Sequence, residues 1–117
     1  MWIVEYYVTS TGQCPTKEFL DNRDKEKELP PIMHDIYQLE EYGNRLQRPT
    51  ASPLRGGIYE LRTRIGHINY RLLYFFFYNE KIIISHGTSK IKIVPPNQID
   101  IAIKHKKDYF SRHMRKE

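Results

Sequence analysis

Residues 57–88, GIYELRTRIGHINYRLLYFFFYNEKIIISHGT, form the stretch that decides the fold. Three runs rich in β-branched and aromatic residues (57–64, 70–78 and 81–88) are separated by short polar breaks. This pattern predicts three consecutive strands joined by hairpins. The middle run is apolar at odd and even positions alike, which is typical of a central strand covered on both faces.

The first hairpin determines what the polar face of this sheet contains. If Gly66-His67 is a two-residue loop, glycine at its first position fits a type II′ turn, and Arg62 then lies directly opposite Arg71. Like charges in such positions repel unless an anion lies between them. Arg64 lies on the same face, because side chains alternate along a strand. A loop longer by one residue would turn Arg71 to the other face, so the interpretation depends on register.

The second hairpin extends this face. If Asn79-Glu80 is its loop, Leu73 pairs with His86 and Arg71 with Thr88, so His86 joins the arginines. The result is a concave basic face, and guanidinium groups suit phosphate because they offer a planar fork of donors. The cations expected on or beside it are Arg62, Arg64, Arg71, Lys90 and Lys92.

The remaining segments complete the expected fold around these strands. They are a strand over 2–8, a short helix opening at Pro15, a helix from Pro30-Pro31 to about Gly43, a connecting loop over 44–56, and a last helix opening at Pro95-Pro96. We therefore expect one α+β domain over residues 1–117. Its mostly antiparallel sheet of about four strands is flanked by N-terminal helices and a C-terminal helix.

Charge divides the chain into two unlike parts. The formal net charge is +5, but residues 1–54 carry 6 basic and 9 acidic side chains, whereas residues 55–117 carry 13 and 5. A concentrated positive half favours polyanionic partners such as RNA. The single cysteine allows no internal disulfide, and neither a signal peptide nor a membrane-spanning run is evident, so we expect a cytoplasmic protein.

The basic face suits cleavage of RNA by attack of a ribose 2′-oxygen on the adjacent phosphate. The arginines would stabilise the developing negative charge, since a guanidinium is a poor base. Proton transfer would fall to His86, Glu60 or a lysine, although a packed His86 is an equally good interpretation. Glu60 is the lone acid on this face, so no metal or cofactor is expected. Tyr109, near the end of the last helix, fits base stacking and core packing equally well.

Several segments, in the same order along the chain, resemble the phage-derived, HigB-like branch of the RelE/ParE superfamily of bacterial toxins. The match is carried by Leu54–Arg62, Tyr70–Tyr74, Tyr42–Leu46, Ile84–Gly87 and Pro96–Tyr109, and it extends over residues 18–110. The resemblance implies a ribosome-dependent mRNA endoribonuclease, the toxin of a type II toxin–antitoxin pair, with a helix-turn-helix antitoxin as partner. It maps the strand arginines of the family to Arg62 and Arg71, and its lysine after the last strand to Lys90.

The chain departs from this family pattern at Thr88, Ile91 and Val94-Pro95, where phenylalanine, lysine and Lys-Thr are usual. A non-catalytic protein on the same fold is therefore the main alternative, either an inactive toxin that binds RNA or an inhibitor of another target, as the gyrase-poisoning relatives are. A small DNA-binding module is a third possibility. It is the least favoured, since the basic residues fall largely on strands and strand ends.

Overall fold

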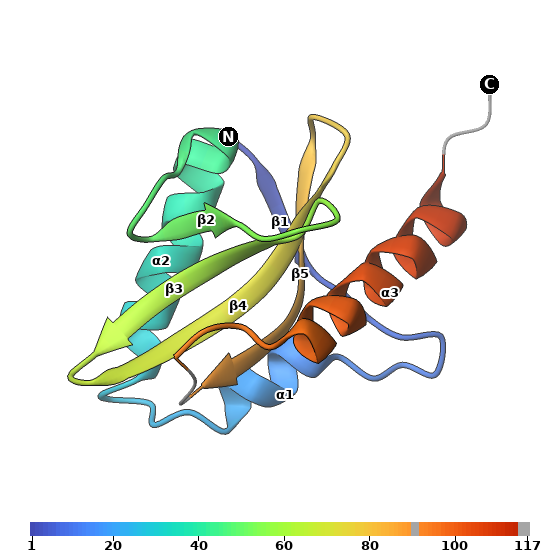
Figure 1. Ribbon diagram of the computed structural model, residues 1–117. Coiled ribbons are helices and arrows are strands. Elements are labelled where there is room, and N and C mark those ends of the chain that lie inside the picture. The colour runs from blue at the N-terminus through green and yellow to red at the C-terminus, as the bar shows by residue number, and fades with distance from the viewer. Residues whose placement is uncertain (90–91, 115–117) are drawn as a thin grey trace.

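The three strands predicted from residues 57–88 form the centre of the sheet. The computed structural model describes residues 1–89 and 92–114, and in it β3 (Tyr59–Ile65), β4 (Ile68–Phe77) and β5 (Lys81–Ser89) run antiparallel. Two shorter strands flank them in the order β1-β5-β4-β3-β2 (Figure 1). β1 (Ile3–Tyr6) pairs parallel to β5, and β2 (Ala51–Pro53) pairs antiparallel to β3.

The α+β class is confirmed, and the sheet is larger and more mixed than expected. β2 lies inside the segment expected to be a loop. The sequence did not predict it, because a strand of three residues ending in proline shows no alternation of polar and apolar residues. The parallel pairing of β1 also departs from the expectation, since alternation within a strand indicates which residues share a face but not which neighbour the strand selects.

Helices cover both faces of the sheet (Figure 1). α1 (Pro15–Asp21) and α2 (Leu29–Tyr42) pack on one face, α3 (Pro96–His113) packs on the other, and a short 3₁₀ turn, η1 (Gly43–Arg45), follows α2. β4 sends alternate side chains into each core: Leu72 lies with the α1/α2 cluster, and Phe75 with the α3 cluster. The expectation of a central strand buried on both faces is thus confirmed. No helix of the described residues is long and apolar enough to cross a membrane.

The register of the first hairpin is the one predicted. Gly66 has φ +61°, as the first loop position of a type II′ turn requires, and Arg62 pairs with Arg71. In the second hairpin the pairs distant from the loop have the expected register, but the pairs next to the loop do not. Its loop has one residue more, since Phe77 pairs with Lys81, and a β-bulge between Leu73 and Tyr74 restores the offset. His86 consequently still pairs with Leu73.

Candidate nucleic-acid interface

Arg71 is one of the two opposed arginines, and it lies in the interior. Its side chain is 3% exposed, and its Nη1 donates to both carboxylate oxygens of Glu60, at 2.9 and 2.8 Å. Its Nη2 donates to the main-chain carbonyl of Lys92. Glu60 lies diagonally across from it on β3, so the anion that the opposed arginines require is supplied by the protein itself.

Arg62 is the other arginine, and its environment is different. Its amide donates to the Thr50 carbonyl at 2.7 Å, so it points away from β4 and the two arginines form a non-hydrogen-bonded pair, the kind with the closer side chains. The guanidinium is partly exposed, and its Nη2 donates to the Pro49 carbonyl at 3.2 Å. Among the described residues no ion pair includes Arg62. Its charge is thus available to an external anion.

A hollow of about 320 Å³ lies beside these arginines, and we call it the basic hollow. Its charged lining is Arg48, Glu60, Arg62, Arg71 and Lys92, and its remaining lining is Ser52, Leu54, Ile93 and Val94. Four cations therefore face one carboxylate, and that carboxylate is already bound to a buried arginine. No group of three or more potential metal ligands occurs among the described residues.

The structure brings three of the predicted site residues, Arg62, Arg71 and Lys92, into this hollow. Lys90 lies outside the described residues. Arg64 lines an adjoining hollow together with Arg62. Arg48 was missed by the sequence analysis, because it lies in the segment expected to be a loop, where no periodicity indicates the direction of a side chain.

His86 does not line the basic hollow. It is 8% exposed, its Nε2 lies 2.9 Å from Oε1 of Gln98, and its Nδ1 lies 2.8 Å from the Ser85 hydroxyl. An amide oxygen can only accept, so Nε2 carries the proton and Ser85 donates to Nδ1. Burial lowers the pKa of His86, which keeps the ring neutral. This arrangement favours the packed interpretation of His86 over proton transfer to RNA.

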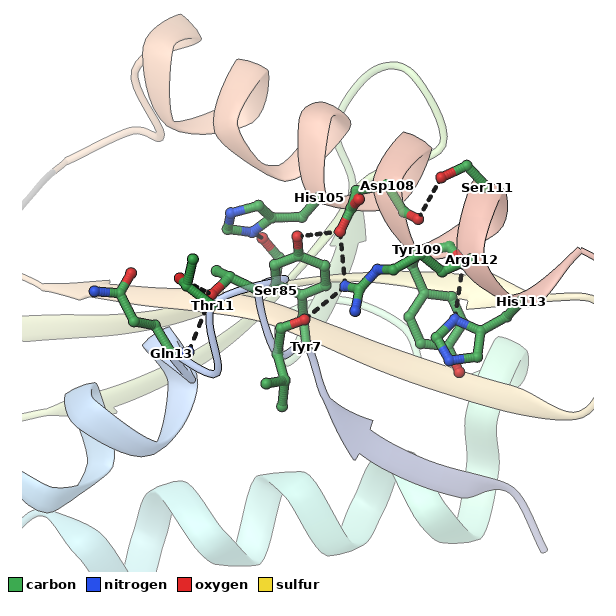
Figure 2. A network of polar contacts seen from close by, with 12 residues as sticks. Tyr7, Thr11, Gln13, Ser85, His105, Asp108, Tyr109, Ser111, Arg112 and His113 are labelled. Carbon is green, nitrogen blue, oxygen red and sulfur yellow. Dashed lines mark hydrogen bonds and ion pairs between the residues drawn. The ribbon is translucent and has the colours of Figure 1, made fainter.

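His86 belongs to what we call the closed cluster, formed by Tyr7, Ser85, His86, His105 and Asp108 between the sheet and α3. Figure 2 labels the four members other than His86. The bulge residue Ser85 also contacts Nδ1 of His105 at 2.7 Å, and the His105 ring stacks on Tyr7 with centroids 4.1 Å apart. Burial, followed by the proximity of His86, lowers the pKa of His105 to about 4.

Asp108 completes the closed cluster (Figure 2). It accepts a hydrogen bond from the Tyr7 hydroxyl at 2.5 Å and pairs with Arg112 at 2.7 Å. The Tyr7 hydrogen bond, with the Arg112 guanidinium, lowers the pKa of Asp108. The Tyr7 hydroxyl, the Asp108 carboxylate and both ring nitrogens of His86 thus have partners within the protein.

Tyr109 is buried as well. It is 5% exposed, its ring packs edge-on against Phe75 and Phe77, and its hydroxyl donates to Glu5 at 2.9 Å. Burial, with the Glu5 hydrogen bond, raises its pKa to about 12. These contacts favour core packing over base stacking for Tyr109.

Comparison with known proteins identifies the family. Residues 18–107 match the family described as phage derived protein Gp49-like (DUF891). No curated protein matches the chain. The matched region runs from within α1 into α3 and includes all the described residues that line the basic hollow. The chain therefore belongs to the Gp49-like family of phage-derived proteins, a family of RelE/HigB-like toxins associated with toxin–antitoxin systems.

Proposed function

We propose that this protein is the toxin of a type II toxin–antitoxin pair and that it cleaves messenger RNA on the ribosome without a metal ion. One observation carries the proposal. Arg62 is partly exposed and outside every described ion pair, at a hollow where Arg48, Arg71 and Lys92 converge. Such a group attracts the RNA backbone and is already in place to stabilise its charge.

The proposed reaction breaks the bond between phosphorus and the 5′-oxygen. The ribose 2′-oxygen gives its proton to water and attacks the phosphorus, the 5′-oxygen leaves with a proton from the Lys92 ammonium group, and a 2′,3′-cyclic phosphate remains. Negative charge accumulates on the non-bridging oxygens in the transition state, and Arg62 offers it a guanidinium fork. Arg71, whose charge is paired with Glu60, lines the hollow and holds the main chain of Lys92 beside it through its Nη2 hydrogen bond.

Lys92 is the described residue best placed for proton transfer. Its side chain is exposed and it lines the basic hollow, while its carbonyl is tied to Arg71. Lys90, which the family resemblance implies as a functional lysine, belongs to the same proposal.

A non-catalytic protein that binds RNA or inhibits another target is the second candidate. A specific observation favours it: both oxygens of Glu60 accept hydrogen bonds from Arg71, and His86 is engaged in the closed cluster. The carboxylate and the imidazole are thus occupied by partners within the protein.

The family implies an antitoxin partner. We propose that this partner carries a helix-turn-helix domain and that it neutralises the toxin. Messenger RNA and the ribosome are the other proposed partners.

Induced expression of the wild type, Arg62→Ala and Lys104→Ala, with mapping of mRNA 5′ ends, tests the proposal. Lys104 is exposed on α3 outside the basic hollow, so Lys104→Ala removes one positive charge as a matched control. We expect growth arrest and new 5′ ends within translated codons for the wild type and Lys104→Ala, and neither for Arg62→Ala. Arrest without new ends would establish the non-catalytic inhibitor instead. Folded wild-type protein that causes neither would overturn the toxin activity.

A further inference from the structure

A second hollow, of about 520 Å³, adjoins the basic hollow, and Arg62 lines both. Its lining is Asp35, Pro49, Thr50, Arg62, Arg64 and Asn69. This volume lies within the range of about 300–1,000 Å³ typical of ligand pockets. If RNA places a phosphate at Arg62, as the proposed function requires, a neighbouring part of the same nucleotide chain comes to this second hollow.

The open edge of the sheet borders the second hollow. β2 pairs with Tyr59 to Leu61, and the Arg62 amide donates to Thr50 beyond the end of that strand. In an antiparallel ladder the amide and carbonyl of every second residue point to the same edge, so those of Arg64 point the same way as the Arg62 amide. The edge thus offers a main-chain donor and acceptor beside the Arg64 guanidinium.

Asp35 gives the second hollow its distinctive chemistry. It comes from α2, and its Oδ2 accepts a hydrogen bond from the buried Thr63 hydroxyl at 2.5 Å, which fixes the carboxylate. A carboxylate repels phosphate and can only accept hydrogen bonds. The second hollow is therefore unsuited to a further phosphate and suited to a ligand that presents donors to Asp35 and acceptors to the arginines.

We propose that the second hollow binds the base next to the phosphate held at Arg62, and that this base is guanine. Guanine presents two neighbouring donors, N1–H and the N2 amino group, and two acceptors, O6 and N7, that match an arginine fork. Adenine and cytosine place an unprotonated ring nitrogen beside their amino groups, and uracil flanks its N3–H with carbonyls. Guanine is thus the base that satisfies a fixed carboxylate and an arginine together.

Binding of short single-stranded RNAs tests this proposal without cleavage. The four RNAs differ only in the base of a central nucleotide, and the ribose 2′-oxygen of that nucleotide is methylated in all four. Fluorescence anisotropy gives their affinities for the full chain. We expect the guanine RNA to bind about tenfold more tightly than the other three, the discrimination typical of one good bidentate contact. An inosine RNA, which lacks the N2 amino group, should bind roughly three- to tenfold more weakly than the guanine RNA.

Asp35→Asn is the matching variant, because asparagine can still accept the Thr63 hydrogen bond but presents a donor in place of the second oxygen. We expect its guanine preference to fall to about twofold, whereas Glu41→Gln, an exposed position on the same helix, should keep it.

Equal affinities for the four RNAs, no binding of any of them, or a guanine preference that persists in Asp35→Asn would overturn the base assignment. Cleavage is decided separately by 5′-end mapping. Cleavage without a guanine preference would leave the proposed function in place, and a guanine preference without cleavage would support this binding site on a non-catalytic protein.

Discussion

The basic hollow and the closed cluster are two polar regions on the α3 side of one sheet, and they differ in where their charges are satisfied. In the closed cluster, Asp108 is bound by Tyr7 and Arg112, and His86 is bound by Ser85 and Gln98. In the basic hollow, Arg71 is bound by Glu60, whereas Arg62 joins no ion pair of the described residues and its guanidinium donates to the Pro49 carbonyl. A buried charge that the fold pairs makes the stability depend on its partner, and a charge that the fold leaves exposed is available to a ligand.

Glu60→Ala should have the largest effect, and the effect should be on stability. Removing the carboxylate leaves the Arg71 charge buried without its acidic partner, which costs about 3–5 kcal/mol of unfolding free energy. Urea denaturation of the variant beside the wild type measures this loss.

The double variant Glu60→Leu/Arg71→Met is the control, since it replaces the ion pair by apolar groups of similar size. We expect it to recover most of the lost stability. A Glu60→Ala protein as stable as the wild type would show that Arg71 is satisfied without Glu60.

Arg62→Ala should show the opposite pattern, with a large loss of activity and little loss of stability. Removing a donor that stabilises transition-state charge typically lowers the rate 10²- to 10³-fold, about 2.7–4 kcal/mol. A partly exposed arginine outside the described ion pairs should change the unfolding free energy by no more than about 0.5 kcal/mol. Cleavage rates on programmed ribosomes and urea denaturation together measure the contrast. A stability loss matching that of Glu60→Ala would erase the distinction between the two arginines.

The sequence predicted the arrangement of the two arginines but not their difference. Opposition of Arg62 and Arg71 follows from loop length and the side-chain period of two, both of which are local. Their difference depends on how deeply each side chain is covered, which is a tertiary property. The diagonal position of Glu60 relative to Arg71 follows from the same register. The segment that carries Lys92 and Val94 returns over Arg71 after β5, and no local pattern indicates that return.

In the second hairpin, the register predicted for His86 is correct although the predicted loop length is not. The loop is longer than predicted by one residue, and the bulge at Ser85 offsets it, so His86 pairs with Leu73 as expected. The bulge residue Ser85 contacts both His86 and His105, which places His86, one of the candidates for proton transfer, in the closed cluster. A bulge leaves alternation on either side intact, so the hydrophobic pattern does not reveal it.

The closed cluster should make stability depend on pH. The pKa of His105 falls from its usual 6.5 to about 4 in the folded protein. The unfolded chain therefore binds a proton first as the pH is lowered, and stability should decrease from about pH 6.5 towards pH 4. Partial exposure of the ring discounts the full shift, so we expect a loss of about 1–2 kcal/mol over this window.

Unfolding free energies of the wild type and His105→Gln between pH 7 and pH 4.5 measure this dependence. The variant should lose less stability on acidification. Because the pKa of His86 is also lowered, the unfolding free energy of the variant should still depend on pH, with a smaller slope. Equal slopes for the two proteins would show that His105 is not the group that titrates.

Tyr109→Phe should have the smallest effect, and it tests whether the RNA-binding surface extends from the basic hollow to α3. The change removes the hydroxyl that donates to Glu5 at 2.9 Å and keeps the ring packed against Phe75 and Phe77. One hydrogen bond contributes about 0.5–1.5 kcal/mol, and Glu5 keeps its ion pair with Lys81, so a loss near 1 kcal/mol is expected. RNA affinity and cleavage should not change, because a ring that is 5% exposed cannot stack on a base. A tenfold loss of RNA affinity in a protein of nearly wild-type stability would instead extend the RNA-binding surface to α3, and the cluster beneath that helix would then be its support.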